Sequence, residues 1–599
     1  MQRSTHERIQ AFIRGLEEGA GARILKMSSA LMAFALLAFW YNADGYHGFS
    51  NQESMESAHL ARQLAGGKGF TTDSIRPLTL GLLQRADTNH AAEVLQHPVP
   101  DLSNAPGYPV VLAGLMKVLP FHFAADQNWF YQPEFLIAGF NELLFFAAVL
   151  LLFHLARRLF DPGVAWVSAI LFAGSQTYWK FSVSGLSTIW LLLVFLSVVW
   201  CLVELEERQR RETPTPGASL ALAAGAGALV GLAALSRYSL GWLIAPALLF
   251  VRLFCVRQRG RLCLWMAVSF LTVMAPWLAR NWALGGAPFG TAGYALVENT
   301  PPLQGDRLER SLSPGAAGLA LVAPRDVVNK FLINGGEILG NELPRLGGNW
   351  VCAFFLCGLL LPYRNPALQR LRSFLIWSLA LLAVVQALGQ THLSSDSPEI
   401  NSENLLVLLA PMVMVFGTSV FFTLLDQISH PDPKVRNLVV VFFAVFMCIP
   451  LILALLGPPR QPAVSPYAPT LIQRTASMMQ PDEEMMSDIP WAVAWYGGHV
   501  CLWLTLDDAA TFDEINRLKP VRAIYLTQRT SDRQFLSQML VNQQSWEYFM
   551  LDSMPTNWAE GEVPTGFGAK YRLTNEPLDY LPAQMFISNS NRWWGGGRR

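Results

Sequence analysis

Charged residues are scarce in this chain of 599 residues. Asp, Glu, Lys and Arg together make up 15% of the sequence, whereas soluble proteins carry about 25%. Hydrophobic residues make up 52%, and the mean hydropathy is +0.29. These values exclude an ordinary soluble domain and indicate a membrane protein. The net charge is zero, and no nucleic-acid partner is expected.

Cysteines are few and scattered, and most lie in apolar runs. No CxxC pair and no ligand-like Cys/His spacing occurs, so the sequence predicts neither a disulfide framework nor a zinc site. A cleavable signal peptide is not expected either. The first apolar run begins after about twenty mostly polar residues and is not followed by a small-residue cleavage site. The seven cysteines are Cys201, Cys255, Cys263, Cys352, Cys357, Cys448 and Cys501.

Long apolar runs, in contrast, are abundant. A helix needs about 20 apolar residues to cross a bilayer. The sequence predicts an α-helical polytopic membrane protein with about eleven transmembrane helices. They fall near residues 24–42, 134–156, 163–181, 184–204, 218–236, 237–254, 262–280, 348–363, 372–390, 402–424 and 437–457.

Basic residues predict the orientation. If the N-terminus is cytoplasmic, each short inside segment is basic, as the positive-inside rule requires. We therefore expect a multi-pass protein of the cell (inner) membrane, with a cytoplasmic N-terminus and an extracytoplasmic C-terminal region. The inside basic residues would be Arg3, Arg8, Arg14, Arg23 and Lys26, then Arg157 and Arg158, Arg208, Arg210 and Arg211, Arg252, Arg257, Arg259 and Arg261, Arg364, Arg370 and Arg372, and Lys434 and Arg436.

Three sizeable pieces lie outside the membrane in this arrangement: a first loop near 43–133, a second near 282–347, and the region from 458 onward. The last of these contains a strand-like run at 488–506, an amphipathic helix in ATFDEINRLKP and a second strand in VRAIYLT. The sequence thus predicts a transmembrane domain over residues 1–457. A small extracytoplasmic α/β domain is predicted over residues 458–599.

The first external loop opens with a predicted helix at 51–65. Glu53, Glu56 and His59 share one stripe of this helix with Gln63, and residues three apart on a helix can face one ligand. We expect the opposite, apolar side to rest on the membrane interface. A solvated helix face is the simpler interpretation of such an acidic pair.

Basic side chains also occur at the outer ends of the predicted spans. They are Lys180, Arg237 and Arg280, the last followed by Asn281. Arginine suits a phosphate group because its planar guanidinium binds bidentately and stays charged. Each could instead extend along the interface to reach water. Three together favour an anionic ligand such as a lipid phosphate, with a nearby carboxylate as general base for an acceptor hydroxyl.

The order of several stretches over residues 24–290 resembles the GT-C superfamily of membrane glycosyltransferases. These stretches are ARQLAGGKGF, APGYPVVLAGL, LARRLFDPGVAWVSAILFA, GLAALSR and APWLARN. The bacterial relatives of protein O-mannosyltransferases and the lipid A aminoarabinose transferase are the most similar in style. The resemblance implies transfer of a sugar from a polyprenyl-phosphate donor to an acceptor glycan, lipid or protein on the extracytoplasmic side.

The resemblance also implies roles for individual residues. The aspartate that serves as base in the family falls on Glu53, and Glu56 one turn later is the alternative. By position, Arg280 and then Arg237 match the contacts to the lipid phosphate. Lys180, His59, Asn281 and His392, the last in the hairpin THLSSDSPEINSENLL, are further substrate-binding candidates.

No resident cofactor is expected, because the polyprenyl-phosphate sugar is itself the donor substrate. An acidic pair could hold a divalent metal, but a single-phosphate donor does not require one. Two alternatives stay open: a non-catalytic protein of the same fold that binds lipid-linked glycan or assists membrane assembly, and a transporter. The transporter is disfavoured because neither paired helix breaks nor a repeat is visible.

Overall fold

The computed structural model describes most of the chain. The N-terminal basic residues Arg3, Arg8 and Arg14 and the tail NRWWGGGRR lie outside the described residues. The described residues are 20–46, 48–86, 98–125, 130–210, 216–312, 322–360, 363, 365–428, 433–457, 467–505, 509–527, 529 and 584–589.

Helices form the membrane part of the molecule, because a helix satisfies its own backbone polar groups where lipid offers no partners. Within the described ranges, seven helices are long and apolar enough to span a membrane. Each coincides with a predicted span, so the chain is a multi-pass membrane protein. They are α7 (Gln132–Leu159), α10 (Thr188–Arg210), α11 (Pro216–Ser236), α13 (Arg259–Gly285), α18 (Pro366–Gly389), α20 (Ala410–Gln427) and α21 (Pro433–Leu456).

The other four predicted spans correspond to α2, a continuous helix of 26 residues, and to three shorter or broken apolar helices. The run at 163–181 is broken at Gly174, whose missing side chain allows Cys448 of α21 to approach closely. The run at 237–254 begins with a 3₁₀ segment instead of an α-helix. The elements are α2 (Ala20–Gly45), α8 (Pro162–Ala173) with α9 (Gln176–Val183), η1 (Tyr238–Leu243) with α12 (Ile244–Phe254), and α17 (Asn349–Gly358).

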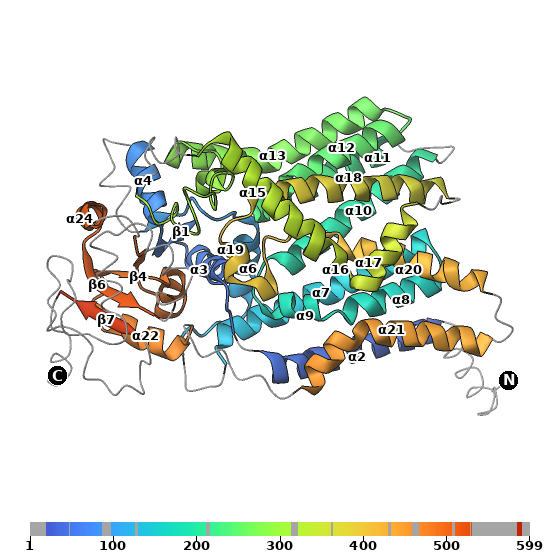
Figure 1. Ribbon diagram of the computed structural model, residues 1–599, viewed down its shortest axis with the longest axis horizontal. Coiled ribbons are helices and arrows are strands. Elements are labelled where there is room, and N and C mark those ends of the chain that lie inside the picture. Colours follow the sequence, from blue (N-terminus) through green and yellow to red (C-terminus); the bar gives the residue numbers. More distant parts are fainter. Residues whose placement is uncertain are drawn as a thin grey trace, which may run out of the picture.

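The helices run along the long axis of the molecule, and a small sheet lies at one end (Figure 1). Helices α2 and α21 lie side by side along one edge of the bundle. Only 6% of the apolar stretch of α21 is buried, whereas 78% of that of α20 is buried. Helix α20 therefore belongs to the packed core, and α21 presents its side chains to lipid.

In the described part of the chain, the sheet at the end of the bundle has five strands in the order β2-β5-β4-β6-β7. The first three pairings are parallel, and β7 is antiparallel to β6. The first external loop supplies the edge strand β2, in which Ser74 pairs with Cys501. The strands are β2 (Ser74–Ile75), β4 (Glu484–Ser487), β5 (Cys501–Trp503), β6 (Val521–Leu526) and β7 (Met585–Ser588).

The strand-helix-strand order predicted after residue 500 is present as β5, α24 (Ala509–Leu518) and β6. The strand predicted to begin at 488 is wrong, because α23 (Pro490–Ala492) and the π-helical η6 (Val493–Gly497) occupy its first part. Trp491 and Trp495 are fully buried there. A short run that is buried on all sides has no periodicity that distinguishes helix from strand.

Helix α3 (Gln52–Ala65) is the predicted opening helix of the first loop, and Gly66 caps it. The expectation that its apolar side rests on the membrane interface is wrong. Met55, Ala58 and Ala61 are completely buried. They are covered by α6 (Gly107–Val118) and by η6 of the C-terminal region.

Shorter elements connect the helices and strands. They are β1 (Thr71–Thr72) paired with β3 (Val99–Pro100), α4 (Pro77–Ala86), η2 (Gly290–Tyr294), α15 (Pro324–Glu337), the π-helical η3 (Ile338–Glu342), α16 (Leu343–Arg345), α19 (Leu393–Asp396), η4 (Pro398–Ile400), η5 (Leu405–Leu408) and α22 (Pro469–Ser477).

Candidate functional site

A cavity of about 210 Å³ lies where α3, the end of α11 and the segments 291–309 and 389–403 meet. We call it the central cavity. Elements far apart in the sequence contribute to it, so only the folded chain assembles it. The charged residues in its lining are Glu53, Arg76, Arg237, Glu298, Glu309 and Glu403.

Glu53 and Arg237, both predicted from the sequence, meet in this cavity. The Nη2 of Arg237 donates to the Oε1 of Glu53 at 2.8 Å. Glu53 belongs to the first turn of α3, and Arg237 has an extended backbone between α11 and η1. Their side chains are 27% and 18% exposed, respectively. The ion pair is therefore partly shielded from water but open to the cavity.

Glu56, one turn after Glu53, has a different environment. Its carboxylate accepts from Gln52 Nε2 at 3.1 Å and from Arg76 Nη2 at 2.6 Å. Arg76 also pairs with Glu309. Burial alone would lower the pKa of Arg76, but the carboxylates of Glu309 and Glu56 raise it above its usual range. Glu56 therefore positions Arg76 at the wall of the cavity. Its carboxylate is engaged in that ion pair and is not free to bind another group.

Glu298, Glu309 and His392 form a buried cluster beside the central cavity. One ligand atom from each lies within 4.8 Å of the others. His392 Nδ1 lies 2.9 Å from Glu298 Oε1. Burial lowers the pKa of His392, but the bond to Glu298 and the charge of Glu309 outweigh it and raise that pKa to about 10. His392 is therefore a cation at neutral pH.

This cluster could hold a divalent metal, because imidazole and carboxylate are ligands that Zn²⁺ accepts. His392 Nε2 is buried without a hydrogen-bond partner among the described residues. As the chain stands, protonated His392 and Arg76 face the carboxylates of Glu298 and Glu309. A metal would compete with those two cations. The expectation of no resident metal remains a prediction.

His59 lies on another side of α3. Its Nε2 accepts from the backbone N–H of Asp73 at 3.0 Å and lies 3.2 Å from Gln63 Nε2. Burial lowers the pKa of His59 to about 4, so the ring is neutral. His59 lines a separate cavity of about 310 Å³ together with Arg62 and Lys68. The structure thus separates His59 from Glu53.

Arg280 and Asn281 connect the first loop to α13. The guanidinium of Arg280 donates to the carbonyls of Asp101 at 2.8 Å and Phe70 at 3.1 Å. Asn281 is buried and donates to the carbonyl of Pro288. The described lining of the central cavity includes neither residue, nor Lys180 of α9. Their substrate-binding roles remain predictions.

Four charged residues of the cavity had no role assigned from the sequence: Arg76, Glu298, Glu309 and Glu403. Glu403 accepts hydrogen bonds from the backbone and hydroxyl groups of both Thr391 and Ser394. Burial raises the pKa of Glu403. No spacing pattern marks these residues, because they come from three separate segments and only Glu298 and Glu309 share one. An arginine directly after the strand-like TTDSI is the only local signal at Arg76.

Comparisons with known proteins agree with this architecture. Residues 129–279 match the family model described as dolichyl-phosphate-mannose-protein mannosyltransferase. The search of curated proteins gave no match.

Two solved structures are similar over most of the chain. The oligosaccharyltransferase AglB of Archaeoglobus fulgidus, in complex with an inhibitory peptide and a dolichol-phosphate, is 14% identical with a TM-score of 0.50, over 94% of this chain and 74% of that chain. ArnT from Cupriavidus metallidurans, bound to undecaprenyl phosphate, is 13% identical with a TM-score of 0.50, over 94% of this chain and 98% of that chain.

These likenesses identify the fold. The chain has the fold of the GT-C superfamily of membrane glycosyltransferases, as its resemblance predicted. The long and short apolar helices and the small C-terminal domain with few strands fit that fold.

Proposed function

We propose that the chain is an inverting glycosyltransferase that moves a sugar from a polyprenyl phosphate to an acceptor hydroxyl on the extracytoplasmic side of the membrane. The observation that carries this proposal is the Glu53–Arg237 ion pair, which lines a cavity at the domain end of a GT-C fold. Both similar structures were solved with a polyprenyl-type phosphate bound, which supports a donor of that chemistry.

Arg237 is the proposed ligand of the donor phosphate. It is a permanent cation, and a guanidinium binds two phosphate oxygens at once. In the structure one of its N–H groups is used by Glu53. Donor binding would draw the guanidinium toward the phosphate and release the carboxylate. Arg76 lies in the same cavity and adds positive charge near the leaving group.

Glu53 is the proposed general base. Its carboxylate would take the proton of the acceptor hydroxyl as that oxygen attacks the anomeric carbon. A new glycosidic C–O bond forms while the bond from the anomeric carbon to the phosphate oxygen breaks. The lipid phosphate leaves with the electron pair, and its charge is stabilised by Arg237. Attack from the face opposite the phosphate inverts the anomeric centre.

The contacts of the two side chains favour Glu53 over Glu56 as the general base. Among the described residues Glu53 has one partner, which a phosphate can draw away, and it reaches the cavity. Glu56 is buried and bonded to both Gln52 and Arg76. A buried carboxylate with these two partners is a poor proton acceptor, because its protonation would leave the buried Arg76 with one negative partner fewer.

Complementation of a deletion strain tests the proposal. Wild type should restore a glycan modification that the deletion strain lacks, and lipid-linked sugar should accumulate in the strain that carries Glu53→Gln. Mass spectrometry of lipid-linked sugars and surface glycans measures both. Glu514→Gln, at an exposed acid on α24, is the matched control. Full restoration by Glu53→Gln would refute the transferase mechanism and favour a non-catalytic glycan-binding protein.

A further inference from the structure

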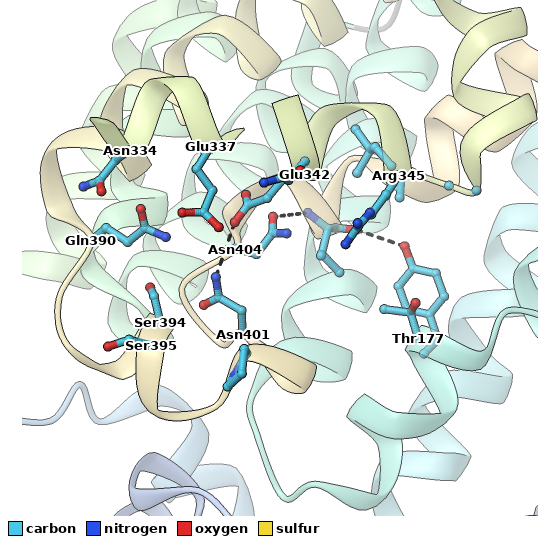
Figure 2. A pocket seen from close by; sticks show the side chains of 18 of the residues that line it. Thr177, Asn334, Glu337, Glu342, Arg345, Gln390, Ser394, Ser395, Asn401 and Asn404 are labelled. Carbon is cyan, nitrogen blue, oxygen red and sulfur yellow. Dashed lines mark hydrogen bonds between the residues drawn. The ribbon is translucent and has the colours of Figure 1, made fainter. Parts of the chain in front are cut away.

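A second and larger cavity lies next to the central cavity. Its volume is about 440 Å³, within the range of about 300–1,000 Å³ that small-molecule sites occupy. Helix α9, the segment from α15 to α16, and the loop after α18 surround it (Figure 2). We call it the amide cavity, because six side-chain amides line it: Asn299, Asn334, Asn341, Gln390, Asn401 and Asn404.

Several of these amides offer hydrogen-bonding groups to the cavity. Asn334 donates to the carbonyl of Ala387, and Asn404 accepts from Val407, so one half of each amide is used by the fold. Gln390 is only 6% exposed. In the described part of the chain, no residue bonds its side-chain amide, which faces the hollow in Figure 2. Its oxygen and nitrogen are therefore available to a polar ligand in the cavity.

The charges of the amide cavity disfavour a phosphate. Glu337 and Glu342 line it together with a single cation, Arg345. Phosphate sites gather cations, and the described lining of the amide cavity contains one, whereas that of the central cavity contains both Arg76 and Arg237. Amides and hydroxyls both donate and accept, which matches the hydroxyl groups of a sugar. Ser394 and Thr391 add hydroxyls to the same lining.

The amide cavity lies beneath an amphipathic helix. The polar face of α15 and η3 supplies Asn334 and Glu342 to the lining. The opposite face exposes Leu332, Ile333 and Leu339 by 62%, 70% and 65%, respectively. Such an exposed apolar face suits contact with lipid. The π-helical segment η3 contains one residue more per turn than an α-helix. Such distortions are frequent at functional sites.

A hydrogen-bonded wall separates the two cavities. Thr391 lines both of them. Its hydroxyl and that of Ser394 donate to Glu403, whose carboxylate belongs to the central cavity. A sugar in the amide cavity would therefore lie directly beside the donor phosphate proposed at Arg237.

We infer that the amide cavity is a saccharide-binding subsite that holds a sugar of the acceptor beside the donor. That the bound sugar belongs to the acceptor rests on the proposed function. That the cavity binds a saccharide rests on its lining residues alone. Asn341 and Gln390 are the informative side chains, because no contact among the described residues depends on either amide. Their removal tests binding with little effect on the fold.

Saturation-transfer NMR on the full chain in lipid nanodiscs tests the inference. The probes are the methyl glycosides of glucose, galactose, mannose and N-acetylglucosamine. At least one should bind the wild type, and Asn341→Ala combined with Gln390→Ala should weaken it about tenfold or more, because two hydrogen bonds are lost. Asn349→Ala, at an exposed amide on α17, is the matched control and should bind as wild type does.

Three results would overturn the saccharide site: no glycoside binds the wild type, the double variant binds as tightly as the wild type, or glycerol 3-phosphate binds instead and is lost in Arg345→Gln. Failure of the proposed function would show separately, as unchanged turnover in Glu53→Gln. The NMR readout does not depend on turnover. The two ideas can therefore fail independently.

Discussion

Replacing Glu53 by glutamine should separate chemistry from donor binding. The amide keeps the shape of the side chain but cannot take the proton of the acceptor. Loss of a general base lowers rates by about 10²–10⁴-fold, which corresponds to about 3–5 kcal/mol in the barrier. We therefore expect turnover per folded molecule to fall by at least a hundredfold.

The same substitution should leave donor binding intact or strengthen it. Arg237 must give up its bond to Glu53 before it can hold a phosphate fully. A pair this exposed is worth about 0.2–1 kcal/mol, so its removal should tighten the binding of undecaprenyl phosphate by up to about fivefold. Native mass spectrometry of the protein in nanodiscs measures this affinity.

Glu56→Gln is the informative comparison. It should destabilise the protein, because the buried Arg76 loses one of its two carboxylate partners. Breaking a buried pair costs about 3–5 kcal/mol. Turnover of the molecules that remain folded should fall less than in Glu53→Gln. The reasoning would be refuted if Glu53→Gln kept more than a third of wild-type turnover, or if it lost donor binding.

Three further predictions concern single residues. Arg237→Gln should weaken undecaprenyl phosphate binding about tenfold or more, since a charge-assisted hydrogen bond contributes about 1.5–3 kcal/mol. If this variant bound the lipid with wild-type affinity, Arg237 would be excluded as the phosphate ligand. Arg280→Gln should lower the melting temperature, because its bonds to the carbonyls of Asp101 and Phe70 are lost; a tenfold loss of donor affinity would instead support the phosphate role predicted from sequence. His59 has its pKa lowered from 6.5 to about 4, so its contribution to stability is present above pH 6.5 and is lost as the pH falls toward 4. Between pH 7 and pH 5 the wild type should therefore lose about 2 kcal/mol of unfolding free energy that His59→Gln does not lose. Thermal unfolding across this range measures the difference, His122→Gln at an exposed position should follow the wild type, and equal slopes in all three proteins would contradict the assignment.

The transmembrane helices could be predicted from sequence because lipid imposes a simple demand on them. A span must be long, apolar and helical, and hydropathy detects this directly. The broken segments at Gly174 and Arg237 were less predictable. Their apolar composition continues across the break, and the interruption depends on a neighbouring helix or on a polar contact formed only in the fold.

The end domain was predicted in outline only. Strand β2 contains two residues of the first loop and pairs with β5 near the other end of the sequence. A pairing this short and distant leaves no periodic signal. The same distance explains why Arg76 and Glu403 were not recognised as residues of the cavity. Glu53 and Arg237 were found because each stands at the end of a predictable helix.

The charge of the cavity also differs from the cluster of basic side chains with one nearby carboxylate that the sequence suggested. Acids outnumber arginines in its lining, and Glu403 is kept in place by Thr391 and Ser394. Burial raises the pKa of Glu403.

The most direct test of the account is a cryo-EM structure of the full chain with undecaprenyl phosphate bound. The account predicts that the phosphate lies in the central cavity within hydrogen-bonding distance of Arg237, and that Glu53 no longer contacts that arginine. A phosphate bound in the amide cavity, or an unbroken Glu53–Arg237 pair with the phosphate elsewhere, would contradict it.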